Sequence, residues 1–87
     1  MSNASEMLHE YILYMVRNVV DKPEEVKVHI SVSTKNIIIQ IECNKSDLGK
    51  IIGKSGRTIG SLQILALAVK NTKFPDDNKK VSIEVLE

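Results

Sequence analysis

The chain has 87 residues, of which 43% are hydrophobic, and a formal net charge of +1. This length allows one small domain with an aliphatic core and leaves no room for a doubly wound parallel sheet. No apolar run approaches the roughly 18 residues of a membrane span and no signal-peptide pattern opens the chain, so a cytoplasmic location is expected.

The first predicted element is an amphipathic helix from Ser5 to Val20. Residues 1–4 resemble a cloning remnant or a disordered N-terminus, so the domain is expected to span residues 5–87. Ser5 is the candidate N-cap, and Pro23 disfavours helical geometry at Lys22. The apolar residues of this segment recur at three- and four-residue steps: Leu8, Tyr11, Ile12, Met15, Val16 and Val19.

Two segments of alternating apolar and polar residues follow, at 26–32 and 37–43. With a turn at 34–36 between them, they predict an antiparallel hairpin whose apolar face meets the helices. Cys43 ends the second segment and has no other cysteine to pair with, so a buried apolar role is favoured over a reactive one.

Two further helices and a last strand complete the predicted order. Ser46 or Asn44 can cap a short helix through residues 47–51, which the glycines at 53 and 56 end. A longer helix runs from Arg57 to about Lys70, weakened locally by Gly60, and a strand at 81–85 closes the chain. The longer helix is expected to bury Ile59, Leu62, Leu65, Ala66 and Val69. This order predicts an α+β fold, α-β-β-α-α-β, with three helices packed on one face of a three-stranded mixed sheet.

The most informative segment is Gly53-Lys54-Ser55-Gly56, followed by Arg57. Two glycines just before a helix start let the backbone turn sharply and leave N–H groups free. The start of a helix carries partial positive charge, and Lys54 and Arg57 add two full charges beside it. The segment therefore predicts an anion site suited to a backbone phosphate.

Two alternatives compete with this interpretation. The glycines could simply shape a connection between helices, as glycine often does in turns. The Gly-Lys-Ser triplet could also end a nucleotide-binding P-loop, but that motif requires a glycine at position 48, which is Leu48. Nucleotide hydrolysis is therefore not expected.

The charge distribution supports a polyanionic partner. Between Lys45 and Lys73 the net charge is +5, whereas the rest of the chain carries −4. This positive region coincides with the glycine loop. A local basic patch of this kind is typical of nucleic-acid binding.

The segment from Ile51 to Ile59 resembles the signature of KH domains, in which a Gly-x-x-Gly loop joins two helices. The order of elements matches the type II arrangement of that fold, and the resemblance covers the chain from Ser5 to Leu86. It is closest to the small single-KH RNA-binding proteins of bacteria, the KhpA type. The resemblance implies an RNA chaperone or post-transcriptional regulator that forms homodimers or pairs with a larger KH-containing protein.

The resemblance also implies a site that holds about four single-stranded nucleotides, with the loop against the RNA backbone. Gly49 and Ile52 are expected on the apolar groove floor, and Thr58 and Ser61 at its edge. The predicted RNA-binding residues are Gly49, Lys50, Ile52, Gly53, Lys54, Ser55, Gly56, Arg57, Thr58 and Ser61.

Other functions fit the sequence less well. His9 and His29 lie in different elements without a nearby ligand cluster, so neither a metal site nor a cofactor is expected, and no catalytic constellation is apparent. A sheet that stacks bases needs aromatic residues, and none falls in a predicted strand. The chain is therefore predicted not to be an enzyme. The remaining alternative is a degenerate KH domain that serves only for protein pairing.

Overall fold

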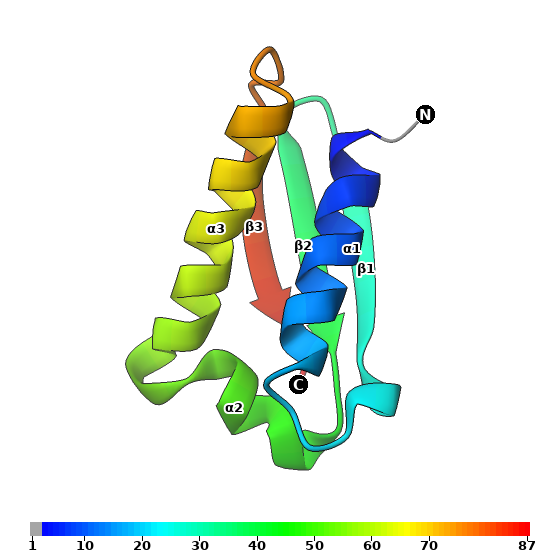
Figure 1. Ribbon diagram of the computed structural model, residues 1–87, viewed down its shortest axis with the longest axis vertical. Helices are drawn as coiled ribbons and strands as arrows, with labels where there is room; N and C mark the ends of the chain where they lie inside the picture. The colour runs from blue at the N-terminus through cyan, green and yellow to red at the C-terminus, as the bar shows by residue number, and fades with distance from the viewer. Residues whose placement is uncertain (1–2) are drawn as a thin grey trace.

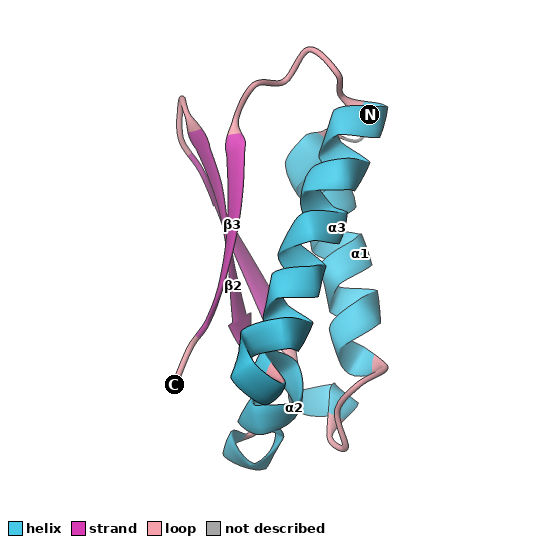
Figure 2. Cartoon of the chain, turned by 90° about the vertical axis from the view of Figure 1, so that its left-hand side faces the viewer, coloured by secondary structure: helices cyan, strands magenta, loops and turns pink. Residues whose placement is uncertain are grey.

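Three α-helices cover one face of a three-stranded sheet in the computed structural model, which describes residues 3–87 (Figures 1 and 2). In chain order the elements, with η for a short 3-10 helix, are α1 (Ala4–Arg17), η1 (Pro23–Glu25), β1 (Lys27–Val32), β2 (Asn36–Glu42), η2 (Lys45–Asp47), α2 (Leu48–Ile52), η3 (Lys54–Gly56), α3 (Arg57–Lys73) and β3 (Lys80–Val85). The predicted fold class and order of elements are confirmed.

The sheet is mixed and has the order β1-β2-β3. The hairpin β1–β2 is antiparallel, as predicted, whereas β3 is parallel to β2, and Ile39 lies opposite both Ile30 and Ile83. A parallel neighbour requires a long crossover, which α2, η3 and α3 provide. The face away from the helices carries mostly polar residues, and His29 is exposed there.

The core lies between the sheet and the helices and consists of aliphatic side chains from both layers. Its buried members are Ala4, Leu8, Ile12, Val16, Val26, Val28, Ile37, Ile39, Ile41, Ile51, Leu62, Ala66, Val81 and Ile83. Ile59 and Cys43 pack against this core and are partly buried, as predicted. Within residues 3–87 no helix combines the length and apolar composition needed to cross a membrane.

The N-terminal helix begins and ends earlier than predicted. Asn3 is its N-cap, because the Asn3 side chain accepts the N–H of Glu6 at 2.9 Å; the assignment of Ser5 as the cap was wrong. Ala4 lies in the helix and is buried, while residues 1 and 2 of the predicted remnant lie outside the described residues. Because α1 ends at Arg17, Val19 falls in the following loop and is exposed.

The long helix α3 also departs from the predicted pattern. It continues to Lys73 instead of ending near Lys70. Leu65, predicted to face the core, is half exposed, because the buried stripe of α3 runs through Leu62, Ala66 and Lys70 at four-residue steps. Leu65 lies about 100° around the helix from Ala66 and so misses this stripe.

Candidate nucleic-acid interface

The glycine loop at residues 53–56 joins α2 to α3 at one end of the molecule (Figure 1). The N–H of Gly53 donates to the carbonyl of Gly49 at 2.8 Å and closes α2. The N–H of Gly56 then donates to the carbonyl of Gly53 at 3.1 Å, so the loop is a single tight turn. The first turn of α3 follows at once.

Three of the four loop residues have positive φ angles: 77° at Gly53, 56° at Ser55 and 73° at Gly56. A Cβ at Gly53 would lie 2.3 Å from Oγ1 and 2.7 Å from the backbone N of Thr58, so this position requires glycine. A Cβ at Gly56 would meet open space, and glycine is favoured there by φ alone. The shape of the turn is therefore enough to explain the glycine at position 53. At position 56 the glycine also leaves the surface open to another molecule.

The loop forms the N-terminal end of a 17-residue helix. Its N-cap, Gly56, has no side chain to accept the first N–H groups of α3, and the first turn contains no acidic residue. These N–H groups and the helix dipole therefore favour an anion. Lys54 and Arg57 are both exposed and bring two positive charges to the same place.

Lys50 differs from these two cations. It lies on α2, but its ammonium group forms an ion pair with the carboxylate of Asp21 and lies 3.6 Å from Oδ1 of Asp47. The hydrogen bond to Asp21 raises the pKa of Lys50 above its ordinary value. Lys50 is one of the predicted RNA contacts, and in this structure two carboxylates surround its ammonium group.

Asp47 is a buried residue that the sequence pattern did not single out. Its two carboxylate oxygens accept the backbone N–H groups of Asp21 at 3.1 Å and Lys22 at 3.0 Å. The hydrogen bond from Asp21 is the main cause that holds the pKa of Asp47 below its ordinary value, against the opposing effect of burial. Through these hydrogen bonds Asp47 connects the segment after α1 to the start of α2, the helix that leads into the glycine loop.

The remaining predicted contacts surround the loop. Gly49 is exposed with open space at its missing side chain, and Ile52 is partly buried beside it on α2. Thr58 packs against Gly53, and Ser61 is exposed one turn further along α3, where its hydroxyl donates to the carbonyl of Arg57 at 2.8 Å. The predicted site residues thus come together around one helix–loop–helix unit.

The strand beside this unit is β3, the edge strand that contacts both α2 and α3. The side chain of Gln63 on α3 accepts the N–H of Ile83 at 3.3 Å and so satisfies one backbone group of that edge. The sequence alone left open which strand lies next to this unit, because strand order depends on long-range pairing.

The predicted basic patch does not form one surface. Lys54 and Arg57 lie at the start of α3, whereas Lys70 and Lys73 lie in its last turn, about 20 Å away. Lys70 is only 2% exposed, and its ammonium donates to the carbonyl of Asp77 in the loop before β3. Its position four residues after Ala66 on the buried stripe is the sequence signal that could have identified it.

Comparison with known proteins identifies the family. The family model KhpA/KhpB, KH domain, matches residues 9–85. The chain belongs to this family of KH domains. The RNA-binding protein KhpA of Chlamydia trachomatis is 44% identical over 80 residues, which cover 92% of this chain and 97% of that protein. Those of Borreliella burgdorferi and Listeria monocytogenes are 35% and 30% identical, and the alignments cover 90% and 92% of this chain and 90% and 100% of those proteins. The family is non-enzymatic, as the sequence predicted.

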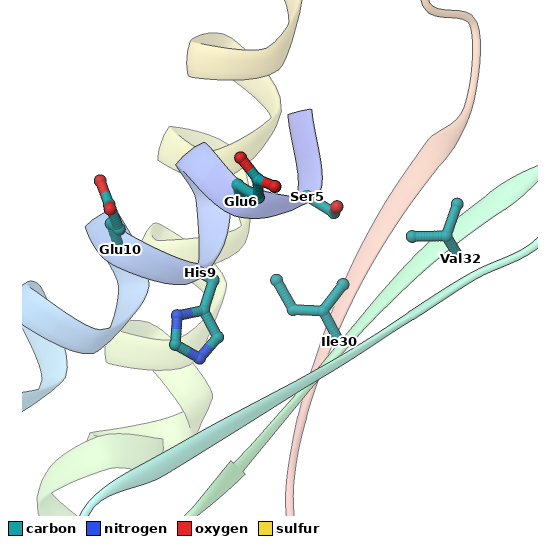
Figure 3. Close-up of a pocket in the computed structure, with 6 residues that line it drawn as sticks. All are labelled: Ser5, Glu6, His9, Glu10, Ile30 and Val32. Atoms are coloured by element: carbon teal, nitrogen blue, oxygen red, sulfur yellow. The ribbon is translucent and has the colours of Figure 1, made fainter. Parts of the chain in front are cut away.

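Elsewhere in this KH domain, a hollow of about 400 Å³ lies between α1 and β1 and contains a serine, a histidine and two glutamates (Figure 3). These residues do not form a catalytic triad. Nε2 of His9 lies 3.0 Å from the carbonyl of Val28, and the hydroxyl of Ser5 donates to Asn3 at 2.7 Å. Figure 3 shows the carboxylates of Glu6 and Glu10 pointing away from the imidazole.

The thiol of Cys43 in this KH domain is also poorly suited to act as a nucleophile. Burial, with the carboxylates of Asp47 and Glu25 nearby, raises the pKa of Cys43. Because the thiolate is the nucleophile, a raised pKa lowers reactivity at neutral pH. Among residues 3–87, no three His, Cys, Asp or Glu side chains gather into a group that could hold a metal ion.

Proposed function

We propose that this chain binds single-stranded RNA in the cytoplasm, as an RNA chaperone or post-transcriptional regulator. The loop geometry carries the proposal: three positive φ angles in four residues end at an uncapped helix start flanked by Lys54 and Arg57. The matched relatives are named RNA-binding proteins, which supports RNA as the source of the anion.

In the proposed complex, the RNA phosphates lie against the loop and the bases lie over α2. Gly53 and Gly56 allow close approach of the backbone, and the N–H groups of the loop and α3 donate to phosphate oxygens. The bases then extend over Gly49 and Ile52, which together present an open position and a partly exposed aliphatic side chain. Thr58 and Ser61 form the edge of this surface.

Salt dependence tests the proposed contact surface. We expect labelled single-stranded RNA to bind more tightly than duplex RNA in fluorescence anisotropy, because bases in a duplex cannot reach α2. With two exposed cations at the loop, the slope of log affinity against log salt should be about −1.4. A slope near zero would show that Lys54 and Arg57 do not contact the phosphates.

We also propose that the chain pairs through the outer face of α3, with a second copy or with a larger KH-containing protein. Ile64 is 71% exposed and Leu67 41% exposed on this face. Gly60 and Ala68, also exposed, leave space for the close approach of another helix. Exposed apolar side chains gathered in this way mark a protein interface more often than an isolated exposed leucine does.

The substitution Ile64→Asp tests this pairing surface. Because Ile64 is mostly in solvent in the single chain, its replacement should leave the fold intact and remove the dimer. Light scattering at micromolar concentration should give twice 9.7 kDa for the parent and 9.7 kDa for the variant. A parent that scatters as 9.7 kDa would contradict a homodimer, and a search for a heterologous partner would follow.

A KH domain used only for pairing is the alternative function. The two glycines, Lys54 and Arg57 count against it, since pairing through Ile64 and Leu67 makes no use of the uncapped helix start or of the two cations beside it. Binding of short single-stranded RNA separates the two functions directly.

A further inference from the structure

Lys50 lies one helical turn before the glycine loop. Its ammonium group forms an ion pair with the carboxylate of Asp21. Asp21 belongs to the segment between α1 and η1, and it reaches Lys50 only because the fold brings this segment against α2. The ammonium group of Lys50 therefore lies between the carboxylates of Asp21 and Asp47. Without these partners, Lys50 would be a third cation close to the proposed RNA phosphates.

The two carboxylates differ in what they do. Asp47 is fully buried, and its oxygens accept two backbone N–H groups, so it has a structural role independent of Lys50. The side chain of Asp21 is 76% exposed, and that of Lys50 is 43% exposed. An ion pair at this exposure adds little to stability, and water or another anion can replace it readily.

We propose that Asp21 is an internal competitor of the RNA backbone: it occupies Lys50 in the free protein and thereby lowers affinity for RNA. This inference rests on the proposed function. A phosphate that approaches the loop must draw Lys50 away from Asp21 or bind without it, and in both cases the affinity is below that of a free third cation. Asp21 thus sets how tightly the domain holds RNA.

The substitution Asp21→Asn tests the proposal. Asparagine keeps the size of the side chain and removes the charge, and the backbone N–H of this residue still donates to Asp47. We expect RNA affinity to rise about two- to fivefold, the range of an exposed ion pair. The salt slope should steepen by about 0.7, since one more cation would meet a phosphate.

A matched control removes the same charge far from the site. Asp76 is exposed in the loop before β3, at the end of the molecule opposite α2 (Figure 1). Asp76→Asn should change affinity by less than the Asp21 variant and should leave the salt slope unchanged. A second comparison, Asp21→Asn in a Lys50→Gln background, tests whether the effect passes through Lys50; there the gain should disappear.

The outcomes separate this inference from the proposed function. If the parent binds RNA but D21N and D76N behave alike, Asp21 is not a competitor. If the gain persists in the K50Q background, Asp21 acts by direct repulsion of phosphate and the role assigned to Lys50 is wrong. If the parent does not bind single-stranded RNA at all, the proposed function fails and the competitor role fails with it.

Discussion

Replacement of Lys54 and Ser55 together by aspartate should reduce RNA affinity at least about tenfold, equivalent to 1.4 kcal/mol. The two carboxylates would face the incoming phosphates, and the charge of Lys54 would be lost. Both side chains are exposed, so the cost to the fold should stay within about 0.5 kcal/mol. Ser55 has a φ of 56°, a region that aspartate enters more readily than most residues.

A control variant with the same change of charge is available at the opposite end of the molecule. Thr34 and Lys35 are exposed in the turn between β1 and β2. Their double replacement by aspartate should reduce affinity far less, because the turn is remote from the loop (Figure 1). A loop variant that keeps its circular dichroism and melting curve and binds RNA like the parent would contradict the phosphate site. A loop variant that unfolds would show that these residues are structural.

Loss of the Asp47 carboxylate should cause a larger drop in stability than replacement of the exposed loop residues Lys54 and Ser55. Asp47→Asn keeps one acceptor oxygen but brings an NH₂ group toward the N–H of Asp21 or Lys22, so one backbone donor loses its partner beside a buried side chain. We expect the melting temperature to fall by at least about 8 °C at neutral pH. The affinity for RNA should also fall, because Asp47 fixes the start of the helix that leads into the loop.

The effect of this substitution should depend on pH in a defined direction. The pKa of Asp47 is lower in the folded chain than in the unfolded chain, so its stabilising effect is complete above the unfolded pKa and is lost as the pH falls through the folded value. The difference in melting temperature between parent and D47N should therefore shrink as the pH falls from about 7 to about 3. Asp77, whose pKa is also lowered, leaves some acid sensitivity in the variant. A constant difference across this range would contradict the role of the ionised carboxylate.

The sequence was a good guide wherever local patterns decide structure. The alternation in the two hairpin segments predicted β1 and β2, and the periodic apolar residues predicted α1 and α3 to within a few residues at their ends. Helix ends were less certain because a cap depends on side-chain geometry: Asn3 and Ser5 are equally good candidates by type, and the structure shows that Asn3 accepts the N–H of Glu6.

In the candidate site, too, the local features could be predicted from the sequence and the long-range contacts could not. The residues of the glycine loop and their backbone conformation follow from a short contiguous segment, since glycine tolerates positive φ and a helix start attracts anions whatever surrounds them. The charges around the loop depend on segments far apart in the chain. Asp21 and Lys50 are 29 residues apart, and only the packing of the segment after α1 against α2 makes them an ion pair.

What the sequence by itself determined was therefore the set of elements, the family resemblance and the position of the glycine loop between two helices. The tertiary structure alone decided that Lys70 is only 2% exposed and remote from the loop. It also decided that Asp47 accepts hydrogen bonds from the segment after α1, and that Lys50 forms an ion pair with Asp21. The reason is physical: conformational preference and periodicity act between near neighbours, whereas the burial and pairing of charges depend on which surfaces meet when the chain folds.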